Sequence, residues 1–175
     1  MPEHSLFEGT ETIYVVDTSA LIMLESTFKP DSLVFKAIWE EIEDLISHGY
    51  FRTIDFVEEE VNSYEGEQTF LKNWVKKWKR YLVVTTDAES IKASIPIINE
   101  EYNTGFFNKQ KLADGKEEAD PYLIGYCKAH SCILITGESK TKPNKLPKVS
   151  EKNGVKCIDI YDFLTERGLK MERKK

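Results

Sequence analysis

A short apolar run near the start of the chain, Tyr14-Val15-Val16, ends abruptly in the carboxylate of Asp17. Two small hydroxyl residues, Thr18-Ser19, follow, and apolar residues then resume over 20–24 at helical spacing. A buried strand of an open parallel sheet delivers such an acid to the carboxyl edge of the sheet, where α/β proteins bind their ligands. The stretch therefore predicts an α/β fold with Asp17 at a functional site.

Further apolar runs at 132–136 and 155–158 predict two more buried strands, and 51–54 predicts a brief one. Amphipathic helices are predicted over 34–46, 67–80 and 160–167, with others starting near Asp55, after a capping box of Thr86 and Glu89, and at Asp120-Pro121. The helix after the capping box is expected to bury Ile91, Ile95, Ile98 and Tyr102. Residues 103–116 and the lysine-rich stretch 140–148 are expected to be loops.

This order of elements implies a mostly parallel sheet with helices on both faces and a large helical middle section over 32–104. A chain of 175 residues without an internal repeat is expected to form a single domain, 1–175. Within it, 1–12 is expected to be a loose amino-terminal arm and 169–175 a basic carboxy-terminal tail.

Cys127, Cys132 and Cys157 lack the spacing of metal-binding pairs and predict free thiols in a reducing cytoplasm. We expect no secretory signal, because three glutamates occupy residues 1–12. We expect no membrane span, because no stretch approaches the roughly 20 apolar residues that a bilayer requires. A net charge of −6 argues against a dedicated duplex-binding domain but leaves nucleic acid open as a ligand.

Four carboxylates lie at strand ends or in helices where a ligand site would collect them: Asp17, Glu60, Asp120 and Glu138. Mg²⁺ prefers oxygen ligands, and a bound ion lowers the pKa of water and neutralises charge on a phosphate under attack. Ser19 and Thr136 are candidates to orient these carboxylates as hydrogen-bond donors.

Each acid also has an ordinary structural alternative. Asp17 suits the cap of the following helical turn, and Asp120, before Pro121, suits an N-cap. The run Glu58-Glu59-Glu60 is typical of a solvated helix face, and Glu138 suits a loop. The pattern leaves open which of the three adjacent glutamates is the functional one.

Taken in order, four motifs resemble those of the PIN-domain family. They are a strand ending in Asp-Thr/Ser (Val15–Ser19), an acid before an aliphatic residue (Val57–Val61, with Glu60 in register), Ala-Asp at a helix start (Ala119–Ile124), and a strand running into Thr-x-acid (Ile133–Glu138). The fourth acid departs from the family pattern, being Glu rather than Asp. The resemblance spans residues 13–165 and is nearest to a bacterial PIN-like subgroup with an ADPYLI-type third motif and an early Trp39-Glu40-Glu41-Ile42 helix.

The resemblance implies a three-layer α/β/α fold and a metal-dependent endoribonuclease that cuts single-stranded RNA. The better-known relatives are VapC-type toxin ribonucleases, so it also implies a type II toxin with a cognate antitoxin. The helix that starts at Asp120 precedes a strand, and the sequence alone leaves open whether Asp120 lies at the same edge of the sheet as Asp17. The resemblance implies that it does, because the family brings its acids together. The implied ligands of Mg²⁺ or Mn²⁺ are Asp17, Glu60, Asp120 and Glu138, with Ser19 and Thr136 as their supports.

Two other functions are compatible with parts of the sequence. A non-catalytic PIN-like module that binds RNA or protein is favoured by the acidic charge and by the altered fourth acid. A haloacid-dehalogenase-type phosphatase also begins with a strand and Asp, but its chemistry needs a second Asp where Ser19 stands.

Several lysines and aromatic residues outside the four motifs are candidates for RNA contacts or for the core. Lysine rows on the 67–80 helix and over 140–148 are candidates to follow a phosphate backbone, with solvated helix faces as the alternative. Phe106, Phe107 and Tyr122 are candidates to stack on bases, whereas Trp74 and Trp78 are expected in the core. The stripe over 34–46 predicts core packing, with a homodimer interface as the alternative.

Overall fold

The computed structural model describes residues 11–66, 69–170 and 172. Its sheet has the strand order β3-β2-β1-β4-β5, and every neighbouring pair is parallel. The predicted α/β fold with a parallel sheet is therefore confirmed. The expected arm (1–12) and tail (169–175) fall largely outside the described residues. The strands are β1 (Tyr14–Val16), β2 (Phe51–Ile54), β3 (Val83–Val84), β4 (Ile133–Ile135) and β5 (Cys157–Ile158).

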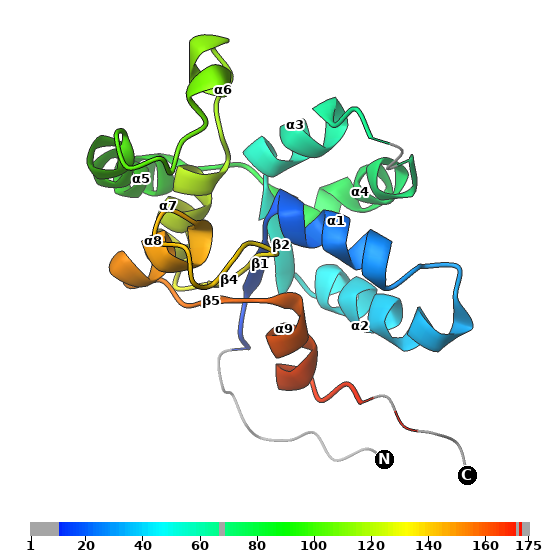
Figure 1. Ribbon diagram of the computed structural model, residues 1–175. Helices are drawn as coiled ribbons and strands as arrows, with labels where there is room; N and C mark the ends of the chain where they lie inside the picture. Colours follow the sequence, from blue (N-terminus) through cyan, green and yellow to red (C-terminus); the bar gives the residue numbers. More distant parts are fainter. Residues whose placement is uncertain (1–10, 67–68, 171, 173–175) are drawn as a thin grey trace.

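Helices flank the sheet in two groups, with the strands between them (Figure 1). One group contains α1 (Thr18–Thr27), the 3₁₀ helix η1 (Leu33–Phe35), α2 (Lys36–Ser47), α3 (Asp55–Ser63) and α4 (Thr69–Leu82). The other contains α5 (Ala88–Glu101), α7 (Asp120–His130) and α8 (Leu146–Lys152). The short α6 (Lys109–Ala113) stands out from the body on an arm, and α9 (Ile160–Glu166) packs near the opposite end.

The strand order places a topological switch beside β1. The chain winds outward from β1 to β2 and β3, then returns to add β4 on the other side of β1, so that Tyr14 pairs with both Phe51 and Ile133. Open α/β sheets bind ligands outside the carboxyl ends of the strands at this point. Asp17 and Thr136 directly follow the two strands concerned.

The contact between α5 and α7 differs from the prediction. Ile91 and Ile95 of α5 are exposed, as is Tyr102 just after it. The buried residues of α5 are Ser90, Ser94, Ile97 and Glu101. The reason is Gly125 of α7, where an added Cβ would lie 2.1 Å from the Ser94 hydroxyl oxygen and 2.5 Å from the Ser90 carbonyl oxygen. The two helix backbones approach so closely that the contact excludes long side chains.

Three local elements were not predicted from the sequence: the two-residue strand β3, helix α6 within the expected loop 103–116, and helix α8, which begins near the end of the expected loop 140–148. The predicted capping box is also wrong. Asp87 is the N-cap of α5 and accepts a hydrogen bond from the Ser90 amide at 2.8 Å. Thr86 instead donates its hydroxyl to Asp55, at 2.5 Å, which joins the ends of β3 and β2.

The core predictions for α2 and Trp74 are confirmed, and Trp78 is partly buried. The α2 stripe is buried from Ile38 to Ile46, although Val34 before it is exposed. Trp74 is buried, and the indole N–H groups of Trp74 and Trp78 both donate to Glu43, at 2.9 and 3.0 Å.

The three cysteines are free, and two of them, Cys127 and Cys132, are buried. Within the described ranges, we find no helix with the length and apolar character needed to cross a bilayer.

Candidate metal centre

Asp17 is a buried carboxylate at the end of β1, and it also caps α1. Its Oδ1 accepts the Ala20 amide at 2.7 Å, and its Oδ2 accepts the hydroxyls of Thr136 at 2.6 Å and Ser19 at 2.8 Å. Burial raises the pKa of Asp17 to about 6, although these three hydrogen bonds lower it. Capping and membership of a charged site are therefore compatible roles for this residue.

Ser19 and Thr136 tie the loop after β4 to the start of α1. The Ser19 hydroxyl accepts the Gly137 amide at 2.9 Å, and the Thr136 hydroxyl accepts the Glu138 amide at 3.1 Å. The approach is close, because a Cβ on Gly137 would lie 3.1 Å from the Ser19 carbonyl oxygen. Asp17 thus sits in a rigid network of hydroxyl and amide donors.

Glu60 is the glutamate of its run that turns toward the same edge. Its Oε1 accepts the Ala119 amide at 3.2 Å, and its Oε2 accepts the Thr18 hydroxyl. Glu58 points elsewhere and pairs with Lys79 of α4 at 2.7 Å, while Glu59 is exposed. Glu60 therefore links the segment that follows Asp17 to the segment that precedes α7.

Asp120 is the first residue of α7, so its predicted role as N-cap is wrong. Ala119 holds the cap position and makes no side-chain capping bond. Because α7 leads back into β4 through a short turn, its amino terminus lies at the carboxyl edge of the sheet. No described residue donates a hydrogen bond to the Asp120 carboxylate. Its pKa is raised well above the usual range, first by burial and then by neighbouring acids: Asp17, Glu138, Glu60 and Glu118.

Glu138 lies beside this group, but both of its oxygens face protein donors. Oε1 accepts the ammonium of Lys145 at 3.2 Å, and Oε2 accepts the Leu146 amide at 2.8 Å. The charge of Glu138 nevertheless contributes to the raised pKa of Asp17 and of Asp120. The four predicted acids are thus brought into one electrostatic neighbourhood, with Glu138 held at its rim.

Glu118 is a fifth acid of this neighbourhood that the sequence analysis missed. It is buried, it accepts the Asn108 amide at 3.1 Å, and its Oε1 lies 4.0 Å from the Lys111 ammonium. Burial raises its pKa, and Glu60 adds to the effect. The pair Glu117-Glu118 looks like a solvated acidic run, so only its nearness to Asp120 could have drawn attention to it.

The donor chemistry suits a hard divalent cation. All five acids offer only oxygen, which Mg²⁺ and Mn²⁺ prefer, and a cation would relieve the crowded negative charge around Asp120. The arrangement is not a preformed cage: no three His, Cys, Asp or Glu side chains of the described residues are grouped closely enough to hold an ion as they stand.

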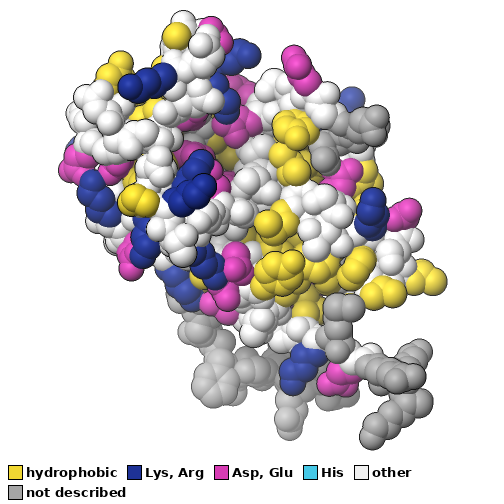
Figure 2. All heavy atoms as spheres, viewed as in Figure 1, with side chains coloured by type: hydrophobic (Ala, Val, Ile, Leu, Met, Phe, Trp, Pro, Cys, Tyr) yellow, Lys and Arg dark blue, Asp and Glu magenta, His cyan; other side chains and the backbone are white. Residues whose placement is uncertain are grey.

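The remaining surface predictions are corrected in part. Phe106 and Phe107 are buried and pack edge to face at 5.3 Å, so they are not base platforms. Tyr122 is half-buried and stacks on Phe56 at 4.1 Å. Figure 2 shows acidic and basic side chains intermixed over the α5–α8 half of the surface and an apolar patch over the α1–α4 half.

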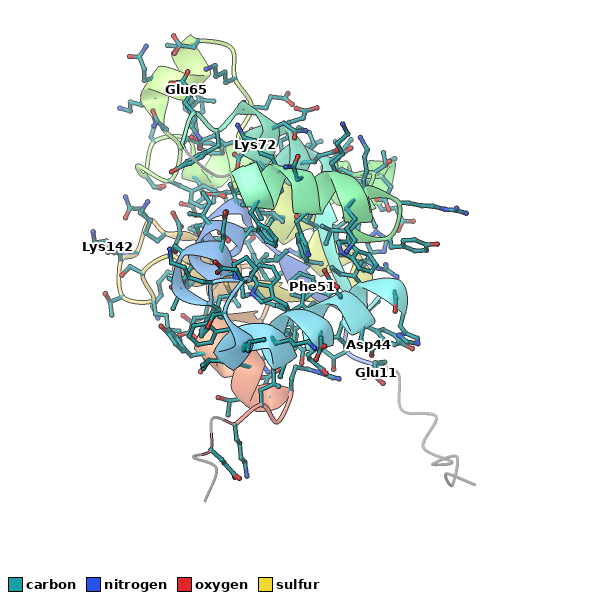
Figure 3. All side chains as sticks on the ribbon, turned by 90° about the vertical axis from the view of Figure 1, so that its right-hand side faces the viewer. Glu11, Asp44, Phe51, Glu65, Lys72 and Lys142 are labelled. Atoms are coloured by element: carbon teal, nitrogen blue, oxygen red, sulfur yellow. The ribbon has the colours of Figure 1, made fainter. Side chains whose placement is uncertain are left out.

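The lysines of 140–148 do not form one continuous basic row. Lys140 pairs with Asp159 and Asp162, each at 2.6 Å, and Lys148 pairs with Glu151 at 2.8 Å. Lys142 projects outward from its loop, as Figure 3 shows. Lys145 turns inward to the acids.

Comparison with known proteins supports the fold. The family model described as "Domain of unknown function (DUF4411)" matches residues 14–171. No curated protein matches the sequence. A chain of the DNA-bound VapBC structure from Salmonella typhimurium is 14% identical, with a TM-score of 0.54 over 85% of this chain and 98% of that chain. A chain of VapBC2 from Rickettsia felis, bound to a promoter fragment, is 13% identical, with a TM-score of 0.52 and the same coverage. At these identities the likeness shows the fold, which is PIN-like.

Proposed function

Because the chain belongs to the DUF4411 family and has a PIN-like fold, we propose that it is a metal-dependent endoribonuclease acting on single-stranded RNA. The observation that carries the proposal is Asp120, a carboxylate without a described hydrogen-bond donor among four other acids at the switch point. The proposed site residues are Asp17, Glu60, Asp120 and Glu138, with Ser19 and Thr136 as supports.

The chain's own residues prepare this site for an ion. Ser19 and Thr136 fix the orientation of Asp17, and Thr18 and the Ala119 amide fix Glu60, as hydrogen bonds commonly orient metal-binding carboxylates. When bound, Mg²⁺ or Mn²⁺ would supply a stronger water nucleophile and neutralise charge on the scissile phosphate. Burial of Asp17 strengthens its interaction with any cation, because the surroundings screen charge poorly.

The biological setting follows from the resemblance to PIN domains. We propose a toxin role with a cognate antitoxin protein, in a cytoplasmic protein whose single domain spans 1–175. Lys111 and Lys145, whose ammonium groups lie near Glu118 and Glu138, are suited to contact a phosphate backbone.

The direct test combines metal binding with cleavage. The purified chain is expected to give a saturable calorimetric heat with Mn²⁺ and to cut a labelled single-stranded RNA in Mg²⁺ or Mn²⁺. Excess chelator should abolish cleavage, and fresh metal should restore it. Cleavage that persists in chelator after dialysis would rule the proposal out.

A second candidate is a non-catalytic module that binds RNA or protein. The observation in its favour is Glu138, both of whose oxygens already face protein donors. This candidate predicts no saturable heat with Mn²⁺ while RNA or a partner protein is still bound, so the same calorimetry separates the two functions.

The adjacent glutamates Glu59 and Glu60 provide a matched pair of variants that tests which of them belongs to the site. Glu60→Gln is expected to lower kcat/KM for RNA about a hundredfold, because it removes a charge held at the site by Thr18 and Ala119. Glu59→Gln, on the exposed side of the same helix, should stay within about threefold of the unchanged protein. Equal losses for the two variants would contradict the assignment of Glu60.

A further inference from the structure

Lys145 is a cation built into the rim of the acid site. It lies at the N-cap of α8 with extended backbone, and its ammonium is 3.2 Å from Glu138 Oε1. It also lies close enough to Glu118 to lower the pKa of that acid. Its side chain remains 42% exposed, so the ammonium faces both the acids and the solvent.

The loop that carries Lys145 is anchored. Asn144 donates its side-chain amide to the Gly105 carbonyl at 3.1 Å, which ties this loop to the arm that carries α6. The Lys145 amide lies 3.3 Å from the Lys142 carbonyl in a turn. The turn therefore fixes the backbone at Lys145, and the contact with Glu138 places the ammonium.

Glu138, which stands where the family pattern has aspartate, explains the contact with Lys145. Glutamate is one methylene longer than the aspartate of the family pattern, and Glu138 uses that reach to contact Lys145 and the Leu146 amide with separate oxygens. Both oxygens of its carboxylate thus already have protein donors, whereas Asp120 has none among the described residues. The two acids are suited to different tasks.

We propose that Lys145 binds a phosphate of the RNA beside the ion, and that Glu138 is a positioning residue for Lys145 rather than a ligand of the ion. This inference rests on the proposed function. An ammonium has three donors, so two remain for phosphate oxygens after the contact with Glu138. A fixed lysine charge at this place supplies part of the neutralisation that a second ion would otherwise supply.

Calorimetry with Mn²⁺ tests the role of Glu138 without any measurement of activity. Glu138→Gln is expected to bind Mn²⁺ within about threefold of the unchanged protein, and Lys145→Gln to bind it equally well or more tightly. Asp120→Asn should lose the saturable heat. Loss of the heat in Glu138→Gln as well would make Glu138 a ligand and overturn the inference, while the proposed nuclease function would stand. No heat in the unchanged protein would instead overturn the proposed function.

RNA cleavage in saturating Mn²⁺ tests Lys145. Lys145→Gln is expected to lower kcat/KM about thirtyfold, mainly through KM, and to reduce the slope of log(1/KM) against log salt by about 0.7, the effect of one phosphate contact on a single strand. Lys145→Arg should recover most of the loss, and Glu138→Gln should share it in part because its lysine is no longer held.

Lys142→Gln is the matched control, since Lys142 lies three residues away on the same loop and is exposed. It should change kcat/KM by no more than about threefold. Equal effects of Lys142→Gln and Lys145→Gln would mean that only the general charge of the loop matters, and would overturn the assigned contact.

Discussion

Asp17→Asn is expected to lower RNA cleavage by about a thousandfold or more while the protein stays folded. The change removes a negative charge from the centre of the acid group, and loss of one ion contact of this kind is worth several kcal/mol in the transition state. Asparagine retains an oxygen that can accept the Ala20 amide, so the cap of α1 survives. Cleavage rates in saturating Mn²⁺ and circular dichroism measure the two effects.

The same variant is expected to be more stable than the unchanged protein when no ion is bound. The pKa of Asp17 is about 6 in the folded chain and near 3.8 in the unfolded chain, so the folded state holds its proton more tightly. The stabilisation that Asp17 contributes is therefore full below pH 4 and is lost as the pH rises through 6, a change of about 3 kcal/mol at most. Asp17→Asn should remove this contribution, while the fall caused by Asp120 and Glu118 remains. Thermal unfolding of both proteins in chelator at pH 4 and pH 8 would measure the difference.

Asp31→Asn, in an exposed loop, is the control for Asp17→Asn. It should leave both cleavage and the pH dependence of unfolding unchanged. Undiminished cleavage by Asp17→Asn would remove the basis for a nuclease site at the end of β1.

Gly125→Val is expected to destabilise the fold by about 3 kcal/mol or more. A Cβ at this position would lie 2.5 Å from the Ser90 carbonyl oxygen, which belongs to the backbone of α5 and cannot rotate away. The two helices would have to separate, and overpacking of this kind costs about 1–3 kcal/mol per site and at times more. Such a loss lowers Tm by roughly 6–12 °C in a chain of this length.

Lys128→Val is the matched control for Gly125→Val. It places the same β-branched residue at an exposed position of the same helix, where only the small difference in helix propensity acts. Its Tm should change by no more than about 2 °C. A similar loss in both variants would show that helix propensity, and not the close approach of α5 and α7, controls stability here.

The central frame of the fold could be predicted because apolar and polar residues in its segments follow local patterns typical of strands and helices. The runs that became β1 and β4 are continuously apolar and end in polar residues, which places Asp17 and Thr136 at one edge of a parallel sheet. Helix α2 has a single apolar stripe that fills the core. In these segments the local preference and the final packing agree.

Other features depend on contacts between distant segments and leave little local signal. Isoleucines at helical spacing in α5 suggested a buried stripe, but Gly125, more than twenty residues later, lies directly against Ser90 and Ser94, and Ile91 and Ile95 are exposed. Phe106 and Phe107 lie in a polar stretch, yet they anchor the arm in the core. Tertiary contacts decided which face was buried in both cases.

The acid site likewise combines a residue whose position follows from the local sequence with residues placed by contacts to distant segments. The strand-end position of Asp17 follows from its immediate neighbours. The orientation of Glu60 depends on Thr18 and Ala119, which lie 42 and 59 residues away. Glu118 resembles a surface acid in the sequence and becomes buried because the arm folds back to donate the Asn108 amide to it.

The strand order also determines at which stage of protein synthesis the acid site beside β1 can form. A growing chain can pair β1 with β2 early, but the other side of β1 waits for β4, whose residues are made more than a hundred positions later. Ribosomes add about 5–20 residues per second, and amino-terminal parts fold first. A nascent chain therefore exposes Asp17 for several seconds without Asp120, Thr136 or Glu138. Premature termination anywhere before β4 yields a fragment that lacks the switch point altogether.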